Sequence, residues 1–222
     1  MLKKVLKSNS SKTEIPDLFV SEGKAFSGLN EITEGFNDFF VNVGPKLASS
    51  IPSTNKTFSE YLSNPIEQNF IFANETPETI FETLSLLKSK ISCGKDNIST
   101  KLLKDIMPNV ISPVVYLFNL SLKTGFIPDS FKCAKVIPIF KSGATCDFTN
   151  YRPISLLSSF SKLLEKLVSR QMFRFIDKYN IIYSHQYGFR PKHDTSHPLL
   201  QFLDKIYQGL KKDESEYALG VF

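Results

Sequence analysis

Two short apolar segments separated by a polar loop constrain the fold of this chain more than any other feature. Residues 134–140 are apolar and rich in β-branched side chains, and residues 151–157 repeat that character after the loop. Such a pair predicts two antiparallel strands, and Pro138 makes the first an edge strand or a bulged strand. We therefore expect a β-hairpin over about 134–157.

The remaining periodic segments carry apolar residues at spacings of three and four, which predicts amphipathic helices. Asn30, Thr76 and Ser99 are suited to cap three of them, and Pro77 fits the first helical position after Thr76. The expected helices cover about 31–49 (with Gly44-Pro45 kinking or splitting it), 76 to before Gly94, Ser99 to Pro108, about 110–123, Ser158 or Ser159 to about 179, and about 198–211. The fold class is therefore α+β and mostly helical.

Less regular segments flank these elements. Residues 1–28 lack sustained periodicity and indicate a loose arm, and residues 51–65 resemble a linker. Residues 69–73 predict a brief strand, and residues 217–222 predict a strand at the end of the sequence.

The positive charge of the chain is concentrated in its middle. Between Phe131 and Asn180 there are nine Lys and Arg against three Asp and Glu, whereas the segments before and after are close to neutral. A local basic block suggests a polyanionic partner, with nucleic acid as the first candidate, and a solvated lysine-rich face is the alternative. The 20 Phe residues point to an aromatic-rich core.

Cysteine usage and hydropathy exclude several classes of protein. The three cysteines, Cys93, Cys133 and Cys146, have neither the number nor the spacing of a disulfide framework or a zinc site. No apolar run reaches the roughly 18 residues of a membrane span, and the basic N-terminus lacks the apolar stretch of a signal peptide. We expect a cytoplasmic or nuclear protein that is neither secreted nor bound to a membrane.

The helix expected after Ser158 carries a basic stripe. Lys and Arg recur there at every fourth position, and four residues turn a helix by about 400°, so the charges form a slowly drifting line. The stripe consists of Lys162, Lys166, Arg170, Arg174 and Lys178. The expected core face of the same helix consists of Phe160, Leu164, Leu167, Val168, Met172, Phe175 and Ile176. The stripe predicts contact with a phosphate backbone, and a solvated helix face remains the alternative.

Six blocks of sequence, taken together, carry a more specific signal. They are Ser92-Cys93-Gly94-Lys95-Asp96-Asn97-Ile98-Ser99, Gly125-Phe126-Ile127-Pro128-Asp129-Ser130-Phe131, Lys135-Val136-Ile137-Pro138-Ile139-Phe140-Lys141-Ser142-Gly143, Asn150-Tyr151-Arg152-Pro153-Ile154-Ser155-Leu156-Leu157, Ser161-Lys162-Leu163-Leu164-Glu165-Lys166 and Gln186-Tyr187-Gly188-Phe189-Arg190. In this order and spacing they resemble the reverse transcriptases of non-LTR retrotransposons, the jockey-like and related LINE elements.

The resemblance implies a domain organisation. Residues 76–222 would be a partial reverse transcriptase domain, comprising the fingers and a truncated first strand of the palm. Residues 1–75 would be a partly disordered connector between endonuclease and polymerase regions, since Asn37-Asp38-Phe39-Phe40 resembles that connector.

The resemblance also implies binding residues. Arg152 is similar to the arginine that contacts the triphosphate of the incoming nucleotide, Lys141 to the lysine at the γ-phosphate, and Arg190 belongs to a block near template and nucleotide. A planar Arg fork and a Lys point charge are suited to neutralise a triphosphate. The alternative is that Lys141 and Arg152 only solvate a hairpin. His193 and Asp194 depart from the family's pattern after Arg190, and an acidic residue there would weaken a phosphate contact.

In the family, a catalytic aspartate follows the strand that corresponds to residues 218–222. We therefore expect the sequence to be truncated just before this aspartate. We also expect that no residue of this chain is catalytic. Two-metal phosphoryl transfer needs paired carboxylates, and the sequence has no Asp-Asp pair. The complete enzyme would be an RNA-directed DNA polymerase using Mg²⁺, dNTPs, an RNA template and a DNA primer, whereas this chain alone would need no cofactor and be inactive. The alternatives are a non-catalytic nucleic-acid-binding module and an inert remnant of a decayed element.

His193 and His197 have the i, i+4 spacing of zinc ligands on a helix. The Glu of an HExxH motif is missing, however, and Pro198 disfavours a helix through both histidines. We expect no metal site.

Overall fold

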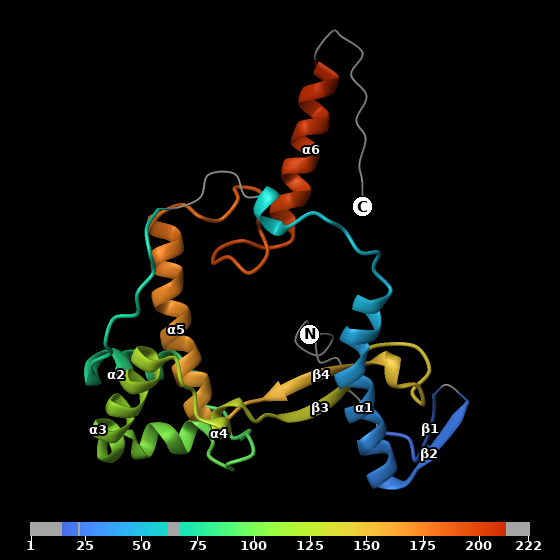
Figure 1. Cartoon of the computed structure of the whole chain (residues 1–222), viewed down its shortest axis with the longest axis horizontal. Coiled ribbons are helices and arrows are strands. Elements are labelled where there is room, and N and C mark those ends of the chain that lie inside the picture. Colours follow the sequence, from blue (N-terminus) through green and yellow to red (C-terminus); the bar gives the residue numbers. More distant parts are fainter. Residues whose placement is uncertain (1–14, 22, 62–66, 212–222) are drawn as a thin grey trace, which may run out of the picture. The chain divides into compact units, whose positions relative to one another are not determined.

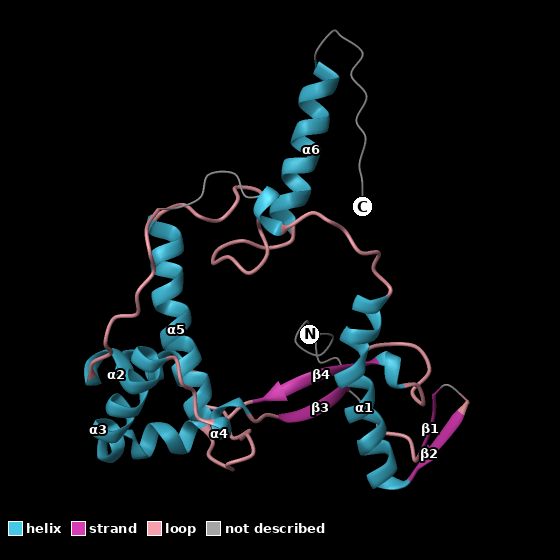
Figure 2. Cartoon of the chain, viewed as in Figure 1, coloured by secondary structure: helices cyan, strands magenta, loops and turns pink. Residues whose placement is uncertain are grey.

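The computed structural model describes residues 15–21, 23–61 and 67–211. Most elements in this part of the chain are helices, and the strands form two separate two-stranded antiparallel sheets (Figure 1; Figure 2). The predicted α+β, mostly helical class is confirmed. The elements are β1 (Leu18–Ser21), β2 (Lys24–Ser27), α1 (Gly28–Ser49), the short 3-10 helix η2 (Phe58–Tyr61), α2 (Pro77–Leu86), α3 (Thr100–Thr124), α4 (Asp129–Lys132), β3 (Lys135–Phe140), the 3-10 turn η3 (Phe148–Asn150), β4 (Tyr151–Leu156), α5 (Ser159–Lys178) and α6 (Ser196–Lys211).

The chain divides into two compact units, which are described separately. The first combines residues 1–65 and 72–168, and the second combines residues 66–71 and 169–222. The strand predicted over residues 217–222 lies outside the described residues, as do positions 1–14 of the predicted arm.

In the first unit, the predicted central hairpin is confirmed as β3 and β4. Its register pairs Lys135 with Leu156 and Pro138 with Pro153. The Lys141 backbone N–H donates to the Asn150 carbonyl over 2.8 Å, which makes this a hydrogen-bonded pair. Because hydrogen-bonded and non-hydrogen-bonded pairs alternate, the two prolines fall on a non-hydrogen-bonded pair, where their missing N–H groups would point away from the partner strand.

The prediction of a loose arm over residues 1–28 is wrong for the part of this segment that the structure describes. Residues 18–27 form the β1–β2 hairpin, in which Phe19 lies opposite Phe26. Each strand has only four residues, too few for alternation to stand out in the sequence. The hairpin is held by burial instead, because the Phe19 side chain is completely buried among aromatic rings of other segments.

Helix α1 follows β2 directly and begins two residues before the predicted cap at Asn30. Ser27 occupies the N-cap position, and its backbone N–H donates to the Glu31 carboxylate over 2.9 Å. Pro45 lies inside the helix without splitting it. The acidic side chain in the first turn also suits the positive end of the helix dipole.

The predicted caps of α2 and α3 are confirmed. The Thr79 backbone N–H donates to Thr76 Oγ1 over 3.3 Å, and the Thr76 backbone N–H donates to Thr79 Oγ1 over 2.9 Å, which completes a capping box with Thr in place of the usual Glu. Ser99 Oγ accepts from the Leu102 backbone N–H over 3.1 Å.

The prediction that Pro108 ends a helix is wrong. Helix α3 runs without a break from Thr100 to Thr124 and contains both Pro108 and Pro113. A proline inside a helix costs about 3 kcal/mol. The helix continues through the prolines because its buried face is continuous. Met107 lies before the two prolines, Val114 and Phe118 lie after them, and all three are buried in one core.

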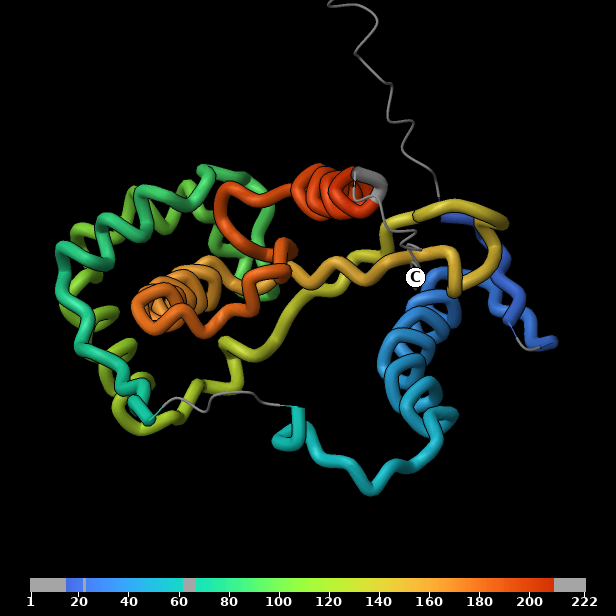
Figure 3. Tube along the Cα trace, turned by 90° about the horizontal axis from the view of Figure 1, so that it is seen from above, coloured from blue at the N-terminus to red at the C-terminus, as the bar shows by residue number. Residues whose placement is uncertain are grey.

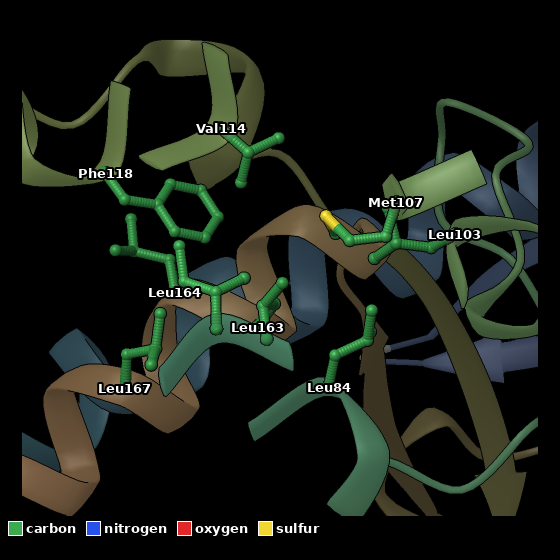
Figure 4. Close-up of a cluster of buried hydrophobic side chains, with 9 residues drawn as sticks. Leu84, Leu103, Met107, Val114, Phe118, Leu163, Leu164 and Leu167 are labelled. Carbon is green, nitrogen blue, oxygen red and sulfur yellow. The ribbon is translucent and has the colours of Figure 1, made fainter. Parts of the chain in front are cut away.

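That core joins α2, α3 and the first half of α5, and Figure 4 shows its side chains pointing toward one another. Its buried members are Ile80, Leu84, Leu103, Met107, Val114, Phe118, Leu163, Leu164 and Leu167. Two predictions for α5 need correction. Met172, expected in the core, is 43% exposed, and Leu163, which lay outside the expected apolar face, is fully buried.

A second core of aromatic side chains lies where α1, the β1–β2 hairpin and the β3–β4 hairpin meet. Phe19, Ile32, Phe36, Phe148 and Tyr151 are its buried members. The two cores lie toward opposite ends of the β3–β4 hairpin, with α2, α3 and α4 at one end and α1 at the other (Figure 1; Figure 3). The abundance of Phe therefore reflects core packing, as predicted.

Two further predictions, which concern mainly the second unit, differ from the structure. Residues 69–73 form no strand, and Phe70 instead packs its ring edge-on against Phe175, with centroids 5.4 Å apart. Helix α6 begins at Ser196 rather than near Pro198, because the Asp194 carboxylate accepts from the Ser196 backbone N–H over 2.9 Å. Pro198 is tolerated there because first-turn N–H groups need no partner within the helix.

Candidate nucleotide-binding and nucleic-acid-binding surfaces

The β3–β4 hairpin brings Lys141 and Arg152 to the same end of one sheet face. Arg152 lies directly opposite Ile139, and Lys141 extends the ladder by one pair beyond Phe140. Since side chains alternate along a strand, Ile139, Lys141 and Arg152 share a face. The other face carries Phe140 and Tyr151, whose rings lie 5.4 Å apart in the aromatic core.

Both cations are exposed and available. Neither the Lys141 nor the Arg152 side chain forms a hydrogen bond or an ion pair with another residue in the described part of the chain. An exposed pair of unpartnered cations on a hairpin end can receive an anion with charge-assisted hydrogen bonds.

The loop of residues 141–150 behind this pair is internally braced. Asn150 Nδ2 donates to the Ala144 carbonyl over 3.0 Å, and the Tyr151 hydroxyl donates to the Thr145 carbonyl over 2.7 Å. Burial raises the pKa of Tyr151, which keeps its hydroxyl protonated as a donor. Gly143 has a φ of 94°, and a Cβ there would lie 2.8 Å from the Asn150 side chain. The bracing roles of Asn150 and Tyr151 were not predicted, because they depend on contacts across the loop.

Arg190 belongs to the second unit and is half-buried. Its guanidinium Nη1 lies 3.4 Å from the Gln186 carbonyl and donates to it. The neighbouring Phe189 is completely exposed and has a φ of 61°, in the left-handed region that a bulky side chain rarely adopts. The Tyr187 hydroxyl donates to the Gln201 side chain, which ties this loop to α6.

Asp194, which departs from the family's pattern, caps α6. Its carboxylate accepts from the Ser196 hydroxyl and backbone N–H, and lies 2.9 Å from His197 Nδ1. The Ser196 hydroxyl, with further help from His197 and the Ser196 N–H, lowers the pKa of Asp194 to about 2. Its charge therefore has a structural role in the loop after Arg190.

The histidines near this loop pack as rings. His193 and His197 have centroids 5.2 Å apart, and both lie close to the Tyr187 ring. Across residues 15–21, 23–61 and 67–211, no group of three or more His, Cys, Asp or Glu side chains is arranged to hold a metal ion.

The predicted basic stripe lies on one continuous helix, α5. Lys166, Arg174 and Lys178 are exposed, whereas Lys162 and Arg170 are half-buried. Of the two predicted caps, Ser158 and Ser159, it is Ser158 that fixes the start of the helix. Its hydroxyl accepts from the Ser161 backbone N–H over 3.0 Å. The exposed members are free to meet a polyanion from solvent.

Several of the family-like blocks meet at the start of α5. The Ser159 hydroxyl donates to the Ile98 carbonyl over 2.8 Å, and the Ser161 hydroxyl donates to the Phe131 carbonyl over 2.9 Å. At Gly94, a Cβ would lie 2.8 Å from the backbone of Leu157 and Ser158. These blocks therefore support the architecture that carries the hairpin.

In the described residues no helix is both long and apolar enough to cross a membrane.

Comparison with known proteins identifies the class. The chain is 32% identical over 162 residues to the probable RNA-directed DNA polymerase from transposon BS of Drosophila melanogaster, a match that covers 72% of this chain and 18% of that protein. It is 29% identical over 164 residues to the RNA-directed DNA polymerase from mobile element jockey of the same species, covering 73% of this chain and 18% of the relative. The jockey polymerase of Drosophila funebris is 29% identical over 193 residues, covering 86% of this chain and 21% of the relative. No family model matches.

These matches define a relative of RNA-directed DNA polymerases. More narrowly, the chain is homologous to the reverse transcriptases of jockey-like non-LTR retrotransposons, which confirms the predicted resemblance. The chain spans about a fifth of the length of these relatives.

Proposed function

We propose that this chain supplies the nucleotide-holding fingers of an RNA-directed DNA polymerase, with Lys141 and Arg152 binding the triphosphate of an incoming dNTP. The observation that carries the proposal is the β3–β4 register, which sets both exposed cations on one face at one end of the hairpin. A guanidinium fork and an ammonium group complement the charge and geometry of adjacent phosphates. The braced loop between them limits the entropy lost when they bind.

Arg190 is proposed to contact the RNA template or the nucleotide. Phe189 beside it offers a bare aromatic ring, and a ring next to a cation is a common platform for unpaired bases. The exposed cations of α5, with Lys162 and Arg170 partly accessible, are proposed to follow the sugar–phosphate backbone of the RNA template and DNA primer. This nucleic-acid-binding role is also the second candidate function, should nucleotide binding fail.

The chemistry of polymerisation is proposed to lie in other parts of a complete enzyme. Paired carboxylates hold the two metal ions of phosphoryl transfer, and the 222 residues contain no Asp-Asp pair. We propose binding as the function of the described residues. We expect no primer extension from this polypeptide alone. The complete enzyme would use Mg²⁺ and act in the cytoplasm or nucleus.

Nucleotide binding can be tested by titrating the protein into a fluorescent dATP analogue. Replacing Lys141 or Arg152 by Gln removes one charge-assisted contact, which should weaken binding by roughly tenfold or more. Lys135→Gln is the matched control, because Lys135 is exposed on the same face but about 20 Å away along β3. Equal loss in all three variants would show a response to net charge alone and would contradict the proposed site.

Backbone binding by α5 can be tested with a labelled RNA oligonucleotide over a range of salt concentrations. The stripe predicts that log K falls with log salt, and that Lys166→Ala or Arg174→Ala each make the slope less negative by about 0.7. Lys101→Ala, an exposed cation on α3, should leave the slope unchanged. A flat salt response of the unaltered protein would refute this role.

A further inference from the structure

The loop that carries Lys141 is held from outside the hairpin by the segment that precedes it in sequence by more than a hundred residues. At its centre is Phe148, which is 1% exposed. Its ring stacks on Phe19 with centroids 4.7 Å apart and meets Phe36 and Phe26 edge-on at 4.8 and 5.2 Å. Each of these three partners comes from a different element, β1, α1 or β2.

Two further contacts fix the loop against the same segment. The Val20 backbone N–H donates to the Cys146 carbonyl over 3.0 Å, so the edge of β1 is bonded to the loop itself. Gly35 of α1 faces Phe148 so closely that a Cβ there would lie 2.5 Å from the tip of the ring. Residue 35 is thus a place where only hydrogen fits while Phe148 keeps its position.

The clamped loop reaches the phosphate-binding pair through short links. Phe148 is two residues from Asn150, whose carbonyl accepts from the Lys141 N–H and whose side chain ties down Ala144. Tyr151 packs in the same aromatic core and is adjacent to Arg152. A shift of Phe148 would therefore be transmitted to both cations over two or three residues of braced chain.

We propose that β1, β2 and the first turns of α1 are a positioning clamp for the nucleotide-binding loop, with Phe19, Gly35 and Phe148 as its positioning residues. The inference rests on the proposed function of Lys141 and Arg152. It moves the start of the nucleotide-binding unit from the predicted boundary near Thr76 to Leu18 or earlier. The clamp acts by restricting the loop and touches no nucleotide itself.

The test adds one methyl group to the clamp in the full chain. Gly35→Ala should displace Phe148, and Asn37→Ala is the control, because it also raises helix propensity in α1 but lies on an exposed position. Hydrogen–deuterium exchange should become about tenfold faster over residues 142–150 in Gly35→Ala alone, while α2 and α3 keep their protection. Binding of the fluorescent dATP analogue should weaken by about tenfold in the same variant.

A second pair of variants separates positioning from stability. Phe19→Leu and Phe118→Leu each remove ring atoms from a fully buried site, one in each core. The clamp predicts that only Phe19→Leu speeds loop exchange and weakens dATP binding at a temperature where both proteins stay folded. Equal effects of both variants, or unchanged loop exchange in Gly35→Ala, would overturn the proposal. If the unaltered protein binds no dATP, the proposed function fails, and loop exchange still decides whether the clamp exists.

Discussion

Replacing Gly94 by Ala should destabilise the fold sharply although it adds only a single methyl group, because Gly94 is buried. The Cβ would lie 2.8 Å from the Leu157 carbonyl carbon and oxygen and from the Ser158 nitrogen. All three atoms are backbone, so no side chain can rotate away. The collision falls where β4 ends and α5 is capped, so relief requires that the two segments separate.

The magnitude follows from what that separation breaks. Overpacking that forces a backbone shift costs typically 1–3 kcal/mol. The Ser159–Ile98 hydrogen bond of 2.8 Å joins the same two segments, and its loss adds about 1 kcal/mol. We expect a loss of about 2–4 kcal/mol, which for a chain of this size lowers Tm by roughly 6–12 °C.

Thermal unfolding followed by far-UV circular dichroism measures this loss, with urea unfolding as an independent check. Gly188→Ala is the control, since a Cβ there has only an ordinary contact at 3.5 Å, and it should leave Tm unchanged or slightly raised. A Gly94→Ala protein within about 0.5 kcal/mol of the unaltered one would refute the close backbone approach.

Three further predictions concern single side chains. Thr76→Ala should lower stability by about 1 kcal/mol by removing the cap of α2, whereas Thr76→Ser should retain it, as urea unfolding would reveal. Asp194 has a folded-state pKa of about 2 against an ordinary 3.8, so its stabilisation of α6 is present above pH 3.8 and is lost as the pH falls toward 2. Helicity measured over that window should fall in the unaltered protein by more than in Asp194→Asn, and equal losses would contradict the cap. Phe189→Ala should weaken binding of a single-stranded RNA oligonucleotide by about 1–3 kcal/mol without changing its salt slope, and a changed slope would contradict stacking.

Local signals predicted the elements that depend on local chemistry. Thr76, Ser99 and Ser158 each satisfy the first turn of a helix with their own hydroxyl, so their caps could be predicted from neighbouring residues. The β3–β4 hairpin was predictable because two apolar segments, the first rich in β-branched residues, flank a short polar loop.

The predictions were wrong where contacts between residues far apart in the sequence determine the structure. Pro108 looked like a helix end, yet burial of Met107 and Val114 on both sides carries α3 through it. The four-residue strand β1 has no readable period and is ordered by Phe148, more than a hundred residues away. For the candidate site, charge and resemblance indicated Lys141 and Arg152, but nothing local indicated that Phe148 braces the loop between them.

The family-like blocks fall into two groups that homology alone cannot separate. Gly94 and Ser161 are used by the fold, through close backbone packing and a partly buried hydrogen bond. Lys141 and Arg152 are exposed, and their side chains have no hydrogen-bond or ion-pair partner in the described part of the chain. Under the proposed function, these two cations on one face of a braced hairpin serve a ligand rather than the fold.

This distinction predicts opposite responses to substitution. Lys141→Gln and Arg152→Gln should keep the free energy of unfolding within about 0.5 kcal/mol of the unaltered protein while weakening dATP binding. Gly94→Ala should lower the free energy of unfolding and leave dATP affinity unchanged in the fraction that remains folded. Gly94 packs against Leu157 and Ser158, beyond the end of β4 that is far from Arg152. If the Gln variants instead destabilise the protein, the two cations belong to the architecture, and the argument for a nucleotide site at this hairpin loses its main support.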